Sequence, residues 1–210
     1  MKKRRVAWCA AGALSVLGLG LACAPANDIV LELGSTTSVA SASRADAGGN
    51  VVDAVDLTRS RNAGPVVANA VIVATIDGDT VVVRIGATTE HLRLLGIDTP
   101  ETHRPGVPIE CFGPEASAFT AKLLPKGTRV RITRDVEARD RYGRLLGQLQ
   151  RASDGLWIDE ALVRAGMAAA KHYSPNLAGT DELESAQAEA RASGRGLWGA
   201  CGGPHEEAPV

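Results

Sequence analysis

The hydrophobic pattern of the chain changes near residue 66, where β-branched, apolar runs begin. Two turn signals, Asp77-Gly78 and Asp154-Gly155, lie next to such runs, and Asp-Gly is a favoured two-residue hairpin connection. Runs of this kind are typical of strands that pair as an antiparallel meander. Five of them predict strands, at residues 66–76, 80–85, 89–97, 128–133 and 144–150.

Three other stretches have apolar residues at helical spacing. They predict helices at residues 114–124, 159–165 and 180–193, each followed directly by Pro or Gly. The order of three strands, one helix, two strands and two helices favours a small closed or half-closed antiparallel barrel with helices at one side. The sequence thus predicts a mainly β domain with helices, of the α+β class, over residues 66–203, followed by a flexible tail over residues 204–210.

The first 65 residues have a different composition. Four basic residues after Met1 precede an apolar stretch that continues to Ala24, which is the pattern of an export signal. Residues 1–26 are therefore predicted to be a signal peptide. Two outcomes stay open: ordinary cleavage after a small-x-small pattern, or a bacterial lipoprotein signal that leaves a lipid on Cys23. Residues 27–65 are rich in Ala, Ser, Thr, Val and Asp without periodicity, which predicts a disordered linker.

This leader and the cysteines set the expected compartment. The protein is expected to be exported by a bacterium, either secreted or periplasmic, or tethered to a membrane only through a lipid on Cys23. Once the leader is set aside, Cys111 and Cys201 remain. Two thiols in an exported chain most simply form a disulfide, and two unpaired cysteines are the alternative. The chain has no C-x-x-C motif, which argues against a redox-catalytic pair.

The overall charge narrows the classes of function. The 210 residues include 23 Lys and Arg and 24 Asp and Glu, a formal net charge of −1, which excludes a uniformly basic nucleic-acid binder. Residues 126–151 nevertheless hold eight basic and three acidic side chains. Such a local excess fits a polyanionic ligand, although a charged, solvated strand edge explains the same residues. The 4 histidines lack metal-ligand spacing and are given no catalytic role.

Three short stretches carry acids and arginines in or beside the predicted strands, at residues 77–80, 93–102 and 139–144. A hairpin turn, a strand that ends in a helix cap and a charged surface hairpin are the simplest structural explanations. These explanations do not account for Arg93, Asp98 and Glu101 on one otherwise apolar segment. Because strand side chains alternate between faces, a bend after Asp98 is expected to bring Glu101 back toward Arg93.

Together these stretches supply what phosphodiester hydrolysis requires. Asp79 and Asp98 offer carboxylates to a hard divalent cation, and a backbone carbonyl near Thr99 offers a third oxygen. Glu101 is the available carboxylate for orienting or deprotonating an attacking water. The guanidinium groups of Arg93 and Arg144 suit the negative charge that gathers on the phosphoryl oxygens in the transition state; these assignments use the residues as they stand in the sequence.

The same motifs closely resemble the staphylococcal nuclease, or thermonuclease, family. The resemblance extends from residue 66 to about residue 199 and rests on five segments, at residues 77–80, 93–101, 112–116, 140–144 and 196–198. It implies a five-stranded OB-fold barrel with three packed helices. It also implies a Ca²⁺-dependent nuclease that hydrolyses the 5′ phosphoester bond of DNA and RNA and releases 3′-phosphate products.

The resemblance assigns a role to each matching position. Arg93 and Arg144 match the phosphate-binding arginines, and Glu101 matches the carboxylate that handles the attacking water. Asp79 and Asp98 match the calcium carboxylates. The remaining matches are the Thr99 carbonyl as a metal ligand, Tyr142 at the terminal phosphate, and Tyr173 as one of two aromatics beside the base pocket.

Lys171 replaces the second aromatic of that pocket. This departure affects the expected nucleotide preference and not the expected reaction, because stacking on an aromatic contributes only roughly 1–3 kcal/mol per base. The expected partners are DNA and RNA, with single strands favoured, and the expected state is a monomer without an obligate protein partner. Two other classes of function stay open: a non-catalytic nucleic-acid-binding module, and an envelope-tethered structural protein.

Overall fold

The structure is a computed structural model that describes residues 64–102 and 108–206. The predicted signal peptide and nearly all of the predicted linker lie outside these residues. Within the two described ranges, no helix combines the length and the apolar character needed to cross a membrane.

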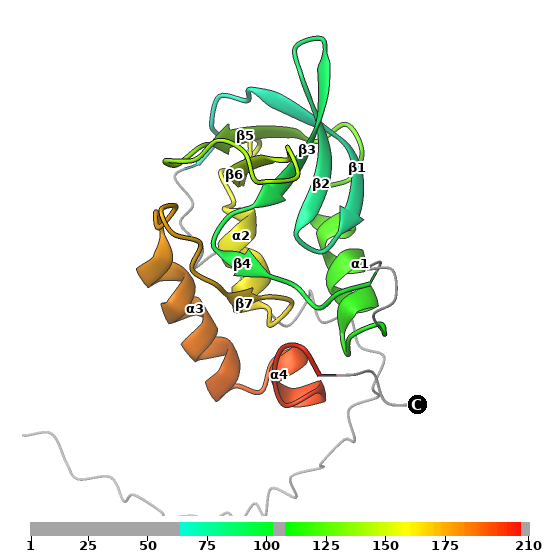
Figure 1. The fold of residues 1–210 in the computed structure, drawn as a ribbon, viewed down its shortest axis with the longest axis vertical. Helices are drawn as coiled ribbons and strands as arrows, with labels where there is room; N and C mark the ends of the chain where they lie inside the picture. The colour runs from blue at the N-terminus through cyan, green and yellow to red at the C-terminus, as the bar shows by residue number, and fades with distance from the viewer. Residues whose placement is uncertain (1–63, 103–107, 207–210) are drawn as a thin grey trace, which may run out of the picture. The chain divides into compact units, whose positions relative to one another are not determined.

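Five strands close into a barrel in the order β1-β2-β3-β6-β5 (Figure 1). They are β1 (Ala70–Asp77), β2 (Thr80–Ile85), β3 (Thr88–Leu94), β5 (Arg129–Thr133) and β6 (Leu145–Arg151). The expectation of a five-stranded barrel is confirmed, but the barrel is not antiparallel throughout. Strands β3 and β6 are parallel, with Leu92 opposite Leu145. Parallel neighbours need a long crossover connection, and the helix and strand between β3 and β6 provide it.

The third predicted strand is divided in the structure. Strand β3 ends at Leu94, and Gly96 turns the chain with a φ of 77°, a conformation that glycine adopts without steric cost. The two-residue strand β4 (Ile97–Asp98) then pairs with β7 (Ala169–Ala170) in a separate small sheet. The prediction of one continuous strand over residues 89–97 was wrong, because the chain already turns at Gly96. A bend also follows Asp98, at Thr102.

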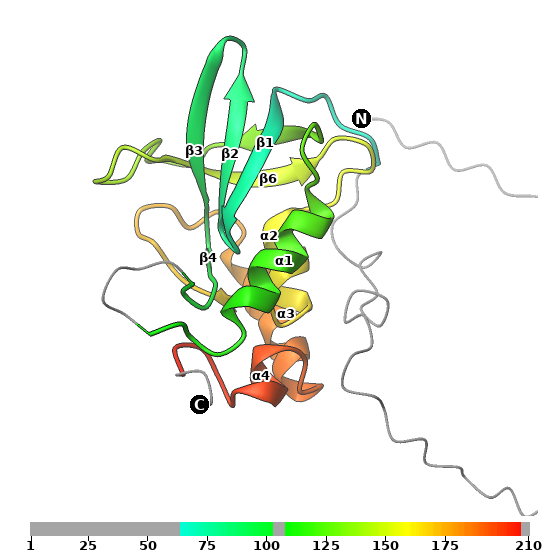
Figure 2. The ribbon, with the colours of Figure 1, turned by 90° about the vertical axis from the view of Figure 1, so that its right-hand side faces the viewer.

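The three predicted helices are confirmed, and a short fourth follows them. They are α1 (Gly113–Leu123), α2 (Ile158–Arg164), α3 (Thr180–Ala192) and α4 (Leu197–Ala200). Helix α1 begins with Pro114 in its first turn, where a missing N–H costs nothing, and it buries Ala116, Phe119 and Leu123 at helical spacing. Figure 2 shows α1 beside the barrel with α2 behind it, so the core lies between the barrel and the helices.

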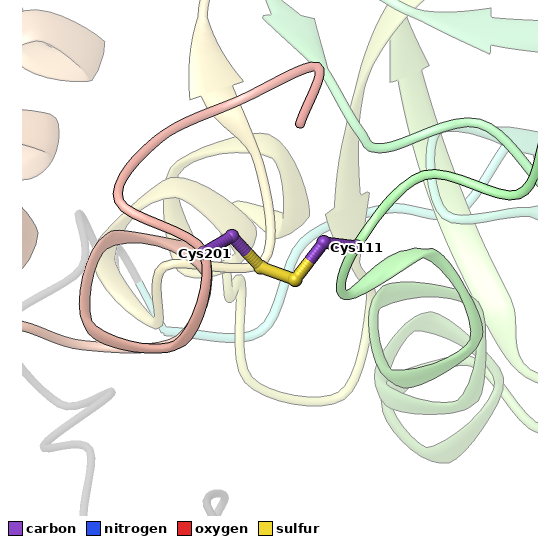
Figure 3. Close-up of a disulfide and its surroundings, with 2 residues drawn as sticks. All are labelled: Cys111 and Cys201. Carbon is purple, nitrogen blue, oxygen red and sulfur yellow. A yellow bond between two sulfur atoms is a disulfide. The ribbon is translucent and has the colours of Figure 1, made fainter. Parts of the chain in front are cut away.

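A disulfide joins Cys111, just before α1, to Cys201, just after α4 (Figure 3). The two cysteines are 90 positions apart and close a long loop, which the chain-entropy model values at roughly 4–5 kcal/mol. Next to it, the Cys111 amide donates a hydrogen bond to the Glu206 carbonyl at 2.8 Å. Residues 204–206, predicted as the start of a flexible tail, therefore have defined contacts, and residues 207–210 lie outside the described part.

Candidate active site

One cleft of about 850 Å³ opens at the rim of the barrel. The β1–β2 turn, the end of β3, β4, the β5–β6 connection and the segment after β7 all contribute to its lining. Every side chain that the sequence proposed for catalysis, metal binding or substrate binding lines this cleft: Asp79, Arg93, Asp98, Thr99, Glu101, Tyr142, Arg144, Lys171 and Tyr173. The fold thus brings together residues that are up to 94 positions apart, the separation of Asp79 and Tyr173.

Arg93, on β3, lies at the centre of the charged groups. Its side chain is only 10% exposed, and its Nη2 atom contacts Asp79 Oδ2 at 3.0 Å and Asp98 Oδ1 at 2.9 Å. Its Nη1 atom donates to the Leu94 carbonyl at 3.0 Å. Burial opposes the charge, but Asp79, Tyr173 and Asp98 together raise the pKa of Arg93 above its ordinary value. The guanidinium is therefore a permanent cation in the cleft.

Asp79 is held by the turn that carries it and by the loop opposite. Its Oδ1 accepts a hydrogen bond from the Thr80 hydroxyl, and its Oδ2 accepts one from the Thr99 amide, both at 3.0 Å. A Cβ atom at Gly78 would lie 2.7 Å from Thr99 Cγ2, closer than such contacts allow. Glycine at position 78 therefore lets the turn approach the loop that contains Thr99.

Asp98, on β4, is surrounded by donors. Its Oδ1 is 2.9 Å from Arg93 Nη2 and 3.4 Å from the Tyr173 hydroxyl, and its Oδ2 is 2.5 Å from Lys171 Nζ. Burial lowers the pKa of Lys171, but the hydrogen bond and charge of Asp98, together with Tyr173, outweigh it and raise the pKa overall. His205 adds a further contact, from Nε2 to Asp98 Oδ2 at 3.3 Å. This carboxylate is therefore the most crowded anion of the cleft.

Glu101 follows β4, and its backbone is fixed by Glu110. The Glu101 amide donates to Glu110 Oε2 at 2.9 Å, and the Glu110 amide donates to the Glu101 carbonyl at 2.9 Å. The Thr102 amide donates to Glu101 Oε1 at 3.1 Å. A Cβ at Gly113 would lie 3.0 Å from the Glu101 carbonyl oxygen, so the start of α1 packs closely on the same peptide.

Arg144 lies at the other side of the cleft, beside an aromatic ring. Its Nε atom is 2.7 Å from Asp140 Oδ2, and its guanidinium carbon is 5.6 Å from the centre of the Tyr142 ring. Burial acts against the charge of Asp140, but hydrogen bonds from the Arg144 side chain and backbone lower the pKa of that carboxyl overall. Tyr142 is 69% exposed, and the Arg141 guanidinium also lies over its ring, 4.8 Å from the ring centre.

Sequence reasoning missed three acidic or basic groups of this site. Asp77, read only as part of a turn, accepts hydrogen bonds from Gly78, Thr102 and Ser117. Burial chiefly raises the pKa of Asp77, with a further contribution from Asp79. Glu110 and His205 also contact each other in the cleft. The predicted pairing of Cys111 with Cys201 was the one signal that the neighbours of both cysteines lie close together.

The donor set is compatible with a hard divalent cation. Within residues 64–102 and 108–206, no three acidic, His or Cys side chains form a group suited to hold a metal. Asp79 and Asp98 nevertheless contact the same guanidinium nitrogen, so both carboxylates reach one position that already carries a positive charge. Carboxylate oxygens suit Ca²⁺ or Mg²⁺, whose remaining positions are filled by carbonyl oxygens and water.

Comparison with known proteins bears on the same residues. A family model described as staphylococcal nuclease homologue matches residues 91–200. The chain belongs to the staphylococcal nuclease family. The predicted resemblance is thereby confirmed, and as a member of this family the protein is a nuclease.

Individual members of the staphylococcal nuclease family are similar over most of the described domain. The thermonuclease of Staphylococcus hyicus is 36% identical over 127 residues, which cover 60% of this chain and 73% of that protein. The thermonuclease of Staphylococcus intermedius is 38% identical over 123 residues, or 59% of this chain and 71% of that protein. The SPbeta prophage-derived endonuclease YokF of Bacillus subtilis is 32% identical over 125 residues, or 59% of this chain and 41% of that protein.

Proposed function

We propose that this nuclease is exported, depends on Ca²⁺, and hydrolyses the 5′ P–O bond of DNA and RNA to leave 3′-phosphate products. The single observation that carries the proposal is the shared cleft, which is lined by two carboxylates, two arginines and a further glutamate: Asp79, Asp98, Arg93, Arg144 and Glu101. A protein that only binds nucleic acid has no need of this combination.

Asp79, Asp98 and the carbonyl of Thr99 are the proposed metal ligands. The Arg93 guanidinium between the two carboxylates marks a position where a cation is favourable, which supports this assignment. When bound there, a divalent ion supplies positive charge that polarises a phosphoryl oxygen. The hydrogen bond from the Thr99 amide to the Asp79 carboxylate holds the β1–β2 turn against the segment that follows β4.

Glu101 is proposed to orient the attacking water and to accept its proton. This role requires a carboxylate whose position is fixed relative to the scissile phosphorus, because a small displacement from the line of attack costs rate. The two backbone hydrogen bonds to Glu110 and the close packing of Gly113 provide that fixation.

Arg93 and Arg144 are proposed to bind the phosphate and to neutralise the charge that develops on its oxygens. Preorganised donors of this kind act strongly in a partly buried site, since no solvent must reorient during the reaction. Arg93 is held by ion pairs with Asp79 and Asp98, and Arg144 is held through its Nε atom by Asp140. A planar guanidinium can bond two phosphate oxygens at once, which an ammonium group does not match.

Tyr142, Tyr173 and Lys171 are the proposed substrate contacts. Tyr142 is assigned to the terminal phosphate, and Tyr173 and Lys171 are assigned to the base. Single strands are favoured, because a stacked and paired base does not offer its face to an aromatic side chain. The Lys171 ammonium lies 5.5 Å from the centre of the Tyr173 ring, so the base side of the cleft combines one ring with one cation. The enzyme is proposed to act as a monomer without an obligate protein partner.

The proposed compartment follows from the leader and the disulfide. A signal peptide over residues 1–26 and a linker over residues 27–65 would deliver the domain outside the cytoplasm. There it would be secreted or periplasmic, or tethered by a lipid on Cys23. The disulfide between Cys111 and Cys201 supports an oxidising compartment.

The test is hydrolysis of single-stranded DNA, double-stranded DNA and RNA by the purified protein, with Ca²⁺ and with a chelator. Glu101→Gln and Arg144→Ala should each lower hydrolysis by about 10²-fold or more, as the loss of a catalytic acid–base group or charge-stabilising donor does. Arg191→Ala is the matched control, because Arg191, on α3, contacts the Trp198 ring of α4 and does not line the cleft. Hydrolysis by Glu101→Gln or Arg144→Ala at the wild-type rate would contradict the assigned roles. Binding of nucleic acid that persists with a chelator, without any cleavage, would show that the protein is a binding module.

A further inference from the structure

We infer that the disulfide-linked C-terminal segment, residues 201–206, forms part of the active site, and that Glu110 and His205 are positioning residues for Glu101. The inference rests on the proposed function, since it concerns the carboxylate assigned to the attacking water. It adds two residues from outside the catalytic motifs, one of them near the end of the chain, to the residues on which the reaction depends.

The segment is tied to Cys111, next to Glu110, by two different bonds. The disulfide joins Cys201 to Cys111 (Figure 3). The Cys111 amide also donates to the Glu206 carbonyl at 2.8 Å. Between these two points, His205 has a φ of 63°, in the left-handed region where His is more frequent than most residues. The chain therefore turns back toward the cleft at His205.

From that turn, the His205 ring contacts two acids of the cleft. Its Nδ1 atom is 3.2 Å from Glu110 Oε2, and its Nε2 atom is 3.3 Å from Asp98 Oδ2. The two ring nitrogens thus face carboxylate oxygens from different segments, Asp98 on β4 and Glu110 before α1. The His205 side chain is 51% exposed, whereas the Glu110 side chain is only 14% exposed. Glu110 is therefore the more buried partner of this contact.

Glu110 transmits this contact to Glu101. The same Oε2 atom that faces His205 accepts the hydrogen bond from the Glu101 amide at 2.9 Å. A contact from His205 restricts the Glu110 carboxylate to the rotamer that accepts this bond. Without it, Glu110 can rotate away, and the Glu101 peptide loses the side-chain acceptor that fixes it. The chain of contacts therefore runs from the disulfide through His205 and Glu110 to the proposed catalytic carboxylate.

The experiment compares steady-state kinetics of the full chain and its variants on single-stranded DNA. His205→Ala should lower kcat by about 10-fold and change KM by less than about 2-fold, because the contact positions a catalytic group and does not bind substrate. Glu110→Ala should lower kcat further. His205→Asn should recover most of the loss, since its amide nitrogen can take the place of Nδ1 as a donor to Glu110.

His172→Ala is the matched control, because His172 pairs with Glu184 and does not line the cleft. It should leave kcat unchanged. The pair Cys111→Ser with Cys201→Ser should lower kcat as His205→Ala does, and adding His205→Ala to it should cost little more. If this pair fails to fold, His205→Ala with the disulfide intact decides the question, with the thermal unfolding midpoint measured beside the kinetics.

A double-mutant cycle separates this inference from the proposed function. In the Glu101→Gln background, His205→Ala should lower kcat by less than about 2-fold, because residues that act as one unit are not additive. An undiminished cost in that background, or a wild-type or raised kcat for His205→Ala alone, would overturn the inference. Full activity of Glu101→Gln itself would instead overturn the proposed function.

Discussion

Two buried arginines of this nuclease have almost the same immediate surroundings. Arg93 contacts Asp79 and Asp98 at 3.0 and 2.9 Å, and Arg164, on α2, contacts Glu160 and Glu189 at 2.5 Å each. Their side chains are 10% and 8% exposed. In both cases, one guanidinium joins two carboxylates from different segments. The ion-pair geometry alone therefore does not tell which arginine belongs to an active site.

The wider surroundings of the two arginines differ. Arg164 links α2 to α3 and does not line the cleft, whereas Arg93 lies where the turns and loops of the barrel rim converge on it. Asp98 is also in contact with Lys171, Tyr173 and His205. Crowding of polar groups around an open cavity, more than burial of one charge, distinguishes the site for chemistry from the structural ion pair.

Substitution of Arg93 is the most direct test of whether Arg93 and Arg164 differ in role. Arg93→Lys keeps the charge but removes the planar pair of donors, so we expect hydrolysis to fall by about 10³-fold, the size seen when a preorganised donor to the transition state is lost. Chemical denaturation should show a much smaller change, because the ammonium still lies between two carboxylates. The rate and the unfolding free energy are measured on the same preparation. Near-normal hydrolysis would assign Arg93 to the structural class of Arg164.

Arg164→Ala is the converse experiment. It removes the buried guanidinium that joins Glu160 to Glu189, and we expect the free energy of unfolding to fall by about 3 kcal/mol, at the low end for a broken buried pair because Glu189 is 42% exposed. Urea denaturation measures this change. The folded fraction should hydrolyse DNA at the wild-type rate, so a lost rate with unchanged stability would show that α2 contributes to catalysis.

A third test concerns Asp159, a fully buried acid at the start of α2. Burial raises the pKa of Asp159 to about 7, against an ordinary value of 3.8, although the Leu149 amide donates to its Oδ2. Because the folded-state pKa is the higher one, the stabilising contribution of the protonated carboxyl is full below pH 3.8 and is lost as the pH rises through about 7. Between pH 5 and pH 7 the wild type should lose about 2 kcal/mol of unfolding free energy from this group.

Asp159→Asn removes the titration and keeps an acceptor for Leu149. The pH dependence of its unfolding free energy should be flatter than that of the wild type over the same interval. Denaturation curves at pH 5, 6 and 7 give the two slopes. Parallel curves for the two proteins would show that Asp159 is ionised throughout this interval in the folded state.

The smallest expected effect is at Lys171, which lines the cleft and is the proposed contact to the base. Lys171→Tyr provides a second ring, and we expect KM for single-stranded DNA to fall by about 5-fold, which corresponds to about 1 kcal/mol of added stacking. The substitution also removes the ion pair with Asp98. Competition between DNA and RNA substrates measures the change of preference, and an increased KM would mean that the ammonium group itself binds the substrate.

The sequence allowed most of this site to be predicted, because its chemistry lies on short continuous segments. Residues 77–80 and 93–101 combine acidic residues and an arginine with strand and turn patterns that can be recognised from the local sequence. The five barrel strands and three helices followed from periodicity in the same way. Each of these features depends on residues that lie close together in the sequence, within about the length of one helix or strand.

The features that the sequence did not reveal depend on contacts between distant segments. Strands β4 and β7 have two residues each, too few for any periodicity, and the parallel pairing of β3 with β6 is set by the crossover between them. His205 reaches Glu110 across 95 positions through a turn without a motif. The burial of Asp159 was equally hidden, since an acid at a helix start is usually solvated.

The small sheet of β4 and β7 links the proposed metal-binding function of Asp98 to the proposed base-binding function of Lys171. Asp98 pairs with Ala169, and the Lys171 amide donates to the Gly96 carbonyl at 2.8 Å, so the proposed ion-binding carboxylate and the proposed base-side cation are joined by backbone hydrogen bonds of one small sheet. Any change that moves one strand moves the other. Laboratory evolution toward a new nucleobase preference at position 171 should therefore alter the proposed calcium dependence of the same enzyme.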